Sequence, residues 1–420
     1  MKAFYFILTL CFISFTVQSQ KKTPYILKPD RIFDGRAMHT NWIVKVNQDT
    51  IAYVGSANNY KGTLKDTIII LKGMTLIPGM IEGHGHLFLY PYNQKSWNDQ
   101  VLKESQSYRV VRATTHAKKN VLAGFTSFRD LGTEGAGYAD FGLKKAIDEG
   151  LIIGPRLQIS SKAIVATGSY GPKDVAPEIT IPLGAEEADG ENLIKVVRSQ
   201  IRAGADFIKV YADYRWGKNN TAAPTFSVKE LKLIVNTANS SGRQVAAHAS
   251  TAEGMRRAIE AGIKIIEHGD GATPEIFNLM AAKKVALCPT LAAGYSIERY
   301  KGWIPEKNKP PKRILQKQKS FAQALKAGVT IVAGGDVGVF EHGNNVLELE
   351  MMVAYGMTPK AVLQSVTAVN AQVFDMPKVG EIKIGNYADL VVVKGNPTKN
   401  INDLRNVKMV IKGGDIVLNK

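Results

Sequence analysis

The chain has 420 residues, 45% of them hydrophobic, which is enough to bury one large core or two smaller ones. Its formal net charge of +17 favours encounters with anionic surfaces. The densest basic run, residues 306–319, contains no aromatic side chain. It therefore predicts a solvated loop that leads into a helix, and it excludes a groove that stacks nucleic-acid bases.

The first predicted element is a signal peptide over residues 1–19. It has one Lys, then a mostly apolar run, then compact residues before a cleavage point after Ser19. A membrane anchor is the alternative, but the run is short and no charged stop-transfer patch adjoins it. We expect an exported protein, periplasmic or secreted, with no stable membrane span after cleavage. Cleavage would remove Cys11 and leave only Cys288, so the mature chain could form no internal disulfide.

Short β-prone runs lie near both ends of the chain. They occupy residues 24–77 and 376–420 and are separated by turn residues. Neither end is long enough for a comfortable domain of its own. We therefore predict that the two ends pair into one small β-sandwich domain.

The central part, residues 78–375, repeats one pattern: a helical stretch, usually a Gly, and then a short apolar run. Gly suits the left-handed position that ends a helix, and such runs are typical of parallel strands covered on both faces. The eightfold repeat predicts an α/β fold, a (β/α)8 TIM barrel. The expected helices are 103–122, 139–149, 190–203, 227–241, 251–261, 273–284, 313–327, and 345–371 in two pieces.

Side chains able to bind metal follow the ends of several predicted strands. The carboxyl ends of barrel strands surround one site, and four of the seven histidines fall there. The residues at this rim are His84, His86, Lys209, His248, His268 and Asp336.

The pair His84 and His86 is the strongest of these signals. Side chains two positions apart on a strand point the same way, ~7 Å apart, so two imidazoles can converge on one Zn²⁺. His248 and His268 could hold a second ion, and Asp336 could contact the first ion and a bound water. A lone His is more often structural, but the matching strand ends favour a metal site.

Lys209 is costly to bury as an ammonium ion. Near cations its pKa should fall, leaving an amine that can react with carbon dioxide. The resulting carbamate would be an anionic ligand able to bridge two ions. The alternative is an ion pair with Asp206 or Asp213.

The motifs PGMIEGHGH, GADFIKV, VAAHA, IEHG and GGD, in this order, resemble the amidohydrolase superfamily of metal-dependent barrel hydrolases. The stretches AGFTSFRDLG, GPRL and ADLVVV, the last after TAVNA, are similar to its imidazolonepropionase-like and Xaa-Pro dipeptidase-like group. The resemblance covers nearly all of the chain after the signal peptide. It implies two Zn²⁺ per chain, Lys209 as a carboxylated bridging ligand, and the other ligands His84, His86, His248, His268 and Asp336.

Two positions depart from the family's pattern. Glu82 stands where Asp is common, which should matter little, and Tyr170 stands where many relatives have His. The second change is expected to alter the substrate pocket. The residues expected to contact substrate are Tyr170, Tyr211, Arg215 and His342, with Arg215 suited to a carboxylate. Residues 132–137 are rich in Gly but carry no dinucleotide or P-loop fingerprint, so nucleotide binding is not expected.

These features predict an exported, metal-dependent amidohydrolase. It would cleave an amide-type C–N bond of dipeptides or N-acyl amino acids through a metal-activated hydroxide. Asp336 would act as general base and then acid, and His268 would orient the oxyanion if only one ion binds. The alternatives are a deaminase or an ester or lactone hydrolase on the same scaffold, and a non-enzymatic envelope-binding protein. The expected partner is a small molecule, and a homo-oligomer is compatible with the sequence.

Overall fold

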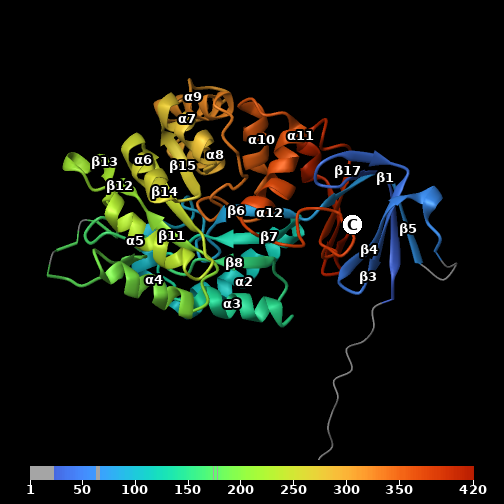
Figure 1. Ribbon diagram of the computed structural model, residues 1–420, viewed down its shortest axis with the longest axis horizontal. Coiled ribbons are helices and arrows are strands. Elements are labelled where there is room, and N and C mark those ends of the chain that lie inside the picture. The colour runs from blue at the N-terminus through green and yellow to red at the C-terminus, as the bar shows by residue number, and fades with distance from the viewer. Residues whose placement is uncertain (1–22, 63–66, 174, 177) are drawn as a thin grey trace, which may run out of the picture.

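The computed structural model describes residues 23–62, 67–173, 175–176 and 178–420. Figure 1 shows a sheet at one side of the molecule and a larger α/β part, in which helices surround central strands. The predicted signal peptide, residues 1–19, lies outside the described residues.

Both chain ends contribute to one eight-stranded sheet. Its order is β19-β18-β17-β5-β1-β3-β4, and β2 pairs with β1. Its strands are β1 (Tyr25–Phe33), β2 (Met38–Thr40), β3 (Trp42–Asn47), β4 (Thr50–Ser56), β5 (Thr67–Pro78), β17 (Leu390–Lys394), β18 (Val407–Lys412) and β19 (Asp415–Asn419). Only β1 and β5 run parallel; every other neighbouring pair among these described strands is antiparallel.

The expected β-sandwich is not confirmed, because the described strands of the two ends form a single sheet. Successive residues of a strand face opposite sides. On β17, Val392 belongs to a hydrophobic cluster specific to this sheet, whereas Val391 and Val393 belong to the large core of the α/β part. The α/β part therefore covers the face that a second sheet would cover in a sandwich.

The α/β part contains two separate sheets that surround the candidate site. A three-stranded sheet has the order β6-β7-β8, and a six-stranded sheet has the order β10-β9-β11-β14-β15-β16. Their strands are β6 (Met80–Gly85), β7 (Phe125–Asp130), β8 (Arg156–Ile159), β9 (Ile164–Val165), β10 (Glu186–Glu187), β11 (Ile208–Tyr211), β14 (Val245–Thr251), β15 (Ile265–Gly271) and β16 (Ala286–Cys288). A further hairpin pairs β12 (Asp213–Arg215) with β13 (Ala222–Pro224).

The strands of these two sheets do not form a closed barrel, which corrects the expectation of one continuous (β/α)8 ladder. The apolar run at residues 156–164, which the central repeat predicts to be one strand, breaks into β8 and β9. At the break Ser161 has a left-handed backbone (φ 64°), and its N–H donates to Asp140 Oδ2 at 2.8 Å. A β-strand cannot continue through that conformation.

The last apolar run of the central repeat, residues 329–336, is not a regular strand but an irregular segment that lies between β16 and β6. Leu287 N–H donates to Thr330 O at 2.9 Å, and Asp336 N–H donates to His84 O at 2.8 Å. Gly334 approaches β6 so closely that a Cβ would lie 2.5 Å from His84 N. The double glycine before Asp336 therefore lets this carboxylate reach the histidines of β6.

Helices cover the outside of the α/β part (Figure 1). They are α1 (Trp97–Lys103), α2 (Gln106–Leu122), α3 (Ala139–Asp148), α4 (Asn192–Arg202), α5 (Val228–Asn239), α6 (Ala252–Ala261), α7 (Pro274–Lys283), α8 (Leu291–Tyr300), α9 (Lys312–Lys326), α10 (Val346–Ala354), α11 (Pro359–Gln364) and α12 (Asn370–Val373). A capping box begins α5, where Ser227 Oγ accepts from Glu230 N–H and the Glu230 side chain accepts from Ser227 N–H. No helix among the described residues has both the length and the apolar character needed to cross a membrane.

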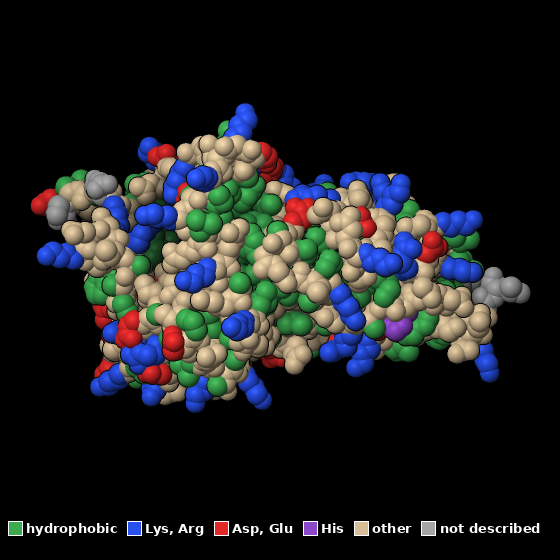
Figure 2. Space-filling model, turned by 90° about the horizontal axis from the view of Figure 1, so that it is seen from above, with side chains coloured by type: hydrophobic (Ala, Val, Ile, Leu, Met, Phe, Trp, Pro, Cys, Tyr) green, Lys and Arg blue, Asp and Glu red, His purple; other side chains and the backbone are tan. Residues whose placement is uncertain are grey.

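Basic side chains are spread widely over the face shown in Figure 2. The run 306–319 leads into α9, as expected from its composition. It is not wholly solvated, however. Lys317 on α9 is buried and donates through Nζ to His268 O at 2.7 Å. One turn of the helix thus brings a lysine of this run into the interior.

Candidate functional site

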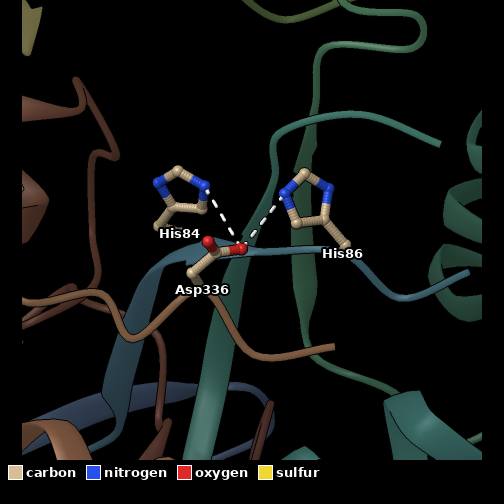
Figure 3. A group of neighbouring side chains, drawn as sticks. All are labelled: His84, His86 and Asp336. Carbon is tan, nitrogen blue, oxygen red and sulfur yellow. Dashed lines mark ion pairs between the residues drawn. The ribbon is translucent and has the colours of Figure 1, made fainter. Parts of the chain in front are cut away.

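His84, His86 and Asp336 form a compact cluster (Figure 3). The two histidines lie on or just after β6, and Asp336 follows the double glycine of the irregular segment. Asp336 Oδ1 lies 3.6 Å from His84 Nε2 and 3.3 Å from His86 Nε2. One ligand atom from each of the three residues lies within 4.8 Å of the other two, a spacing that fits a single metal ion.

The outer nitrogens of both imidazoles are already engaged. His84 Nδ1 lies 2.8 Å from Glu267 Oε2, and His86 Nδ1 lies 2.9 Å from Gly132 O. Because a carboxylate and a carbonyl only accept, each Nδ1 carries the proton, and each Nε2 presents its lone pair inward unless it too is protonated. Hydrogen bonds of this kind to the outer nitrogen orient metal-binding histidines.

The inward-facing atoms are arranged so that a cation could lie between them. Asp336 Oδ1 is buried and has no hydrogen-bond donor among the described residues. Burial acts to lower the pKa of His86, yet Asp336 raises it to about 9. The donor set, two imidazoles and a carboxylate, suits Zn²⁺ and similar divalent ions, so the residues present fit a metal.

His248 and His268 lie near the middle of β14 and β15, not at their ends as expected, and both line the same cavity. Their ring centroids are 4.5 Å apart, and that of His268 is 5.1 Å from that of His84. Burial lowers the pKa of His248 to about 3 and that of His268 well below its usual value. Both are therefore neutral and able to coordinate, although they do not join the tight cluster of His84, His86 and Asp336.

Lys209 lies on β11 and is buried. Burial lowers its pKa, against the opposing charges of Glu267 and Asp336. The two acids considered as partners are engaged elsewhere: Asp206 pairs with Lys144 at 2.7 Å, and Asp213 accepts from the backbone N–H groups of residues 250–251. The alternative of an ion pair with Asp206 or Asp213 is therefore wrong in the described structure.

Glu82 joins the two segments that carry the cluster. Its Oε1 accepts from His84 N–H at 3.2 Å and from Gly335 N–H at 2.8 Å, and its Oε2 accepts from Asn345 at 2.7 Å. Burial raises the pKa of Glu82 to about 7. The presence of Glu82 at a position where Asp is common was expected to matter little. The Glu82 side chain nevertheless fixes the backbone beside both His84 and Asp336.

The cluster opens into a cavity of about 570 Å³. Its wall includes the tyrosines Tyr92, Tyr170, Tyr211, Tyr214 and Tyr300. Its cationic residues are Arg215, Lys301, Arg313 and Lys317. The predicted contacts Tyr170, Tyr211 and Arg215 thus line the cavity.

His342 is placed differently. It lies outside the cavity lining, stacks on His116 with ring centroids 4.1 Å apart, and contacts Leu89 O through Nε2 at 3.2 Å. In this position it packs behind the loop that follows β6 rather than facing the cavity.

Sequence reasoning missed Glu134 in the cavity wall. It follows β7 closely, at the edge where the other site residues were sought. The sequence signal for Glu134 is a carboxylate just after a predicted strand end, within the glycine-rich residues 132–137. Arg313 and Lys317 were missed because their run was assigned to solvent.

Four residues of the cavity wall have left-handed backbones: Glu134 (φ 49°), His268 (φ 78°), Thr290 (φ 48°) and Asp336 (φ 63°). Such conformations cost about 1–3 kcal/mol each in non-glycine residues and persist only where the surroundings impose them. Their concentration around one cavity marks it as a functional site.

Comparison with known proteins agrees with this geometry. The model of the amidohydrolase family matches residues 75–417. The chain belongs to the amidohydrolase family. This amidohydrolase is 30% identical to the ochratoxinase of Aspergillus niger over 417 residues, covering 91% of this chain and 84% of that protein.

Solved structures are also similar to this amidohydrolase. An Xaa-Pro dipeptidase with methionine bound in its active site has a TM-score of 0.84 and 28% identity, covering 94% of this chain and 100% of the other. A prolidase complexed with N-methylphosphonate-L-proline has a TM-score of 0.82 and 25% identity, covering 95% and 100%. The resemblance inferred from the sequence motifs is confirmed. The protein is a hydrolase that acts on C–N bonds, in a family that is usually metal-dependent.

Proposed function

We propose that this protein is an exported, metal-dependent amidohydrolase that cleaves the amide C–N bond of dipeptides or N-acyl amino acids. The observation that carries the proposal is the inward orientation of His84, His86 and Asp336. Their inner atoms converge, while Glu267 and Gly132 hold the outer imidazole nitrogens. A hydrolytic metal centre requires donor atoms that already point toward one position, and these three side chains provide such atoms.

Each residue of the site has a separate role in the proposed reaction. A divalent ion held there would lower the pKa of a coordinated water and polarise the scissile carbonyl. Asp336 is placed to take the proton of the attacking water and to return it to the leaving nitrogen. Its pKa of about 2, which burial would raise but His84 and His86 lower, keeps it ionised and ready to accept. If only one ion binds, His268 would orient the developing oxyanion.

The cavity suits a substrate with a carboxylate and an apolar side chain. Arg215 and Arg313 supply cations, and the tyrosines supply amphipathic walls. The names of the similar proteins point the same way: one binds methionine, and another binds a phosphonate derivative of proline. These observations support an amino-acid-derived leaving group.

Several finer features belong to the same proposal. Lys209, buried and with a lowered pKa, would be carboxylated and would bridge two Zn²⁺. Residues 78–375 would form the hydrolase domain, and residues 24–77 and 376–420 would form a second domain. The N-terminal residues 1–19 would direct export to the periplasm or the medium.

A substrate screen with metal analysis tests the proposal. The protein without residues 1–19 would be loaded with Zn²⁺ and assayed against dipeptide and N-acyl amino acid libraries. We expect turnover of at least one class, about two ions per chain, and loss of activity on chelation. One ion with ammonia release would instead indicate a deaminase. No bound ion together with binding of anionic envelope polymers would indicate a non-enzymatic protein.

A further inference from the structure

Glu134 is a buried carboxylate in the wall of the cavity. It follows β7 and has a left-handed backbone (φ 49°), so the surrounding structure holds it in place against its own conformational preference. Its Oε2 accepts two hydrogen bonds, from Trp97 Nε1 at 2.8 Å and from the Tyr170 hydroxyl at 2.7 Å. The side chain is therefore fixed by neutral donors.

The other oxygen of Glu134 is available. Oε1 receives no hydrogen bond from any described residue, and it lies 4.0 Å from His86 Nδ1. That nitrogen already donates to Gly132 O at 2.9 Å. Oε1 is thus an acceptor one imidazole ring away from the His84–His86–Asp336 cluster.

Among the ion pairs of the described residues, Glu134 takes part only in the long contact of 4.0 Å with His86 Nδ1. Buried Arg109 is nearby, but it donates to the carbonyl oxygens of Phe88 and Thr133. The other carboxylates of the cavity wall are engaged: Asp336 in the cluster and Asp270 in an ion pair with Lys317. A buried carboxylate is costly when its one ionic contact is this long and uses a nitrogen that already donates to Gly132 O, so a cation supplied by the ligand would be favourable.

We propose that Glu134 is a specificity-determining residue that binds the free α-ammonium group of a dipeptide substrate. This inference rests on the proposed amide hydrolysis and narrows it to substrates with a free N-terminus. In a dipeptide a single carbon atom separates the ammonium nitrogen from the scissile carbonyl carbon. A carbonyl held at the cluster therefore places the ammonium group within reach of a carboxylate beside His86. An N-acyl amino acid has no cation at this position.

Glu134→Gln tests the proposal, because Gln keeps an oxygen that accepts from Trp97 and Tyr170 but removes the charge. A dipeptide and its N-acetylated counterpart would be compared as substrates. We expect kcat/KM for the free dipeptide to fall roughly 10- to 100-fold, as for loss of a charge-assisted hydrogen bond, and kcat/KM for the acetylated one to change less than about threefold. The control is Glu187→Gln, at a carboxylate that accepts from Gly168 N–H outside the cavity lining.

Binding without turnover separates this inference from the proposed function. Calorimetric titration of the metal-loaded protein with leucinamide and with N-acetyl-leucinamide should show a preference for the free amine that Glu134→Gln abolishes. If neither peptide class is hydrolysed, the proposed function fails, yet this binding preference still decides the role of Glu134. No preference in the wild type, or an equal loss of both ligands in the variant, would overturn the inference and leave Glu134 with a purely structural role.

Discussion

Glu267 Oε2 lies 2.8 Å from His84 Nδ1, and both side chains are excluded from solvent. Burial acts to raise the pKa of Glu267, but His84, Lys209 and Arg129 bring it down to about 2. An ionised carboxylate at this distance fixes both the tautomer and the rotation of the imidazole. The geometry of the inner cluster therefore depends on a residue that does not belong to it.

Glu267→Gln should weaken metal binding and activity without removing a ligand. The amide oxygen can still accept from His84, but the charge that makes the imidazole a better donor is lost. We expect roughly a 10- to 100-fold loss in metal affinity or in kcat/KM. Competition with a chromophoric chelator and steady-state kinetics measure the two effects. Wild-type values for both would show that Glu267 has no orienting role.

Asp336→Asn should abolish most turnover while leaving the fold intact. The amide cannot accept the proton of the attacking water, and loss of a general acid–base group typically costs about 10²–10⁴-fold. Turnover would be followed with the best substrate of the screen, and circular dichroism would report folding. Full turnover in a folded variant would exclude Asp336 as the proton shuttle.

Metal removal should lower the thermal stability of the protein. An ion bound only by the folded chain contributes about 2.7 kcal/mol when its free concentration is 100 times Kd. Chelator-treated and Zn²⁺-reconstituted samples would be compared by scanning calorimetry, with reconstitution expected to restore the higher Tm. His86→Ala serves as the control, because chelation should shift its Tm much less. Equal Tm values in treated and reconstituted wild type would contradict a metal site.

Stability should decline as pH rises from 4.5 to about 8, in part because of Glu348 on α10. Burial raises its pKa from 4.5 to about 8, and its Oε1 has no donor among the described residues. The folded chain thus retains a proton that the unfolded chain loses in this window, so the stability present at low pH is lost as pH approaches 8. Glu348→Gln cannot ionise and should flatten the slope by up to about 1.4 kcal/mol per pH unit.

Urea unfolding at a series of pH values measures that slope. Exposed Glu178→Gln should keep the wild-type dependence. An unchanged slope in Glu348→Gln would assign the pH dependence to other buried acids.

Arg129→Met should destabilise the fold strongly. The guanidinium lies between the rings of Phe207 and Phe374, 4.1 Å from each centroid, and 3.7 Å from Glu267 Oε1. Its removal leaves a buried carboxylate without this cation, which typically costs about 3–5 kcal/mol. Arg256→Met, at an exposed ion pair, should lower the free energy of unfolding far less. Similar unfolding free energies for the two variants would show that the buried pair is unimportant.

Local patterns were sufficient to find much of the candidate site. The two-residue spacing of His84 and His86, and the predicted strand ends at His248, His268 and Asp336, follow from chain-local rules, and the structure brings these residues to one cavity. Their metal binding stays a prediction. The break between β8 and β9 at Ser161 could not be predicted from the local sequence. It depends on Asp140, which comes close to Ser161 only in the folded chain. The same holds for Lys317, whose burial depends on how α9 packs beside β15.

The sheet shared by the two chain ends has a consequence for how the molecule is made. Thr75 Oγ1 donates to Gly395 O across a sequence separation of 320 residues. Such a contact cannot form until nearly the whole polypeptide has been synthesised, and its loop closure is entropically slow. Nascent chains should therefore expose the apolar edge of β5 until β17 arrives, and shortening the C-terminus would leave that edge open to association with other chains.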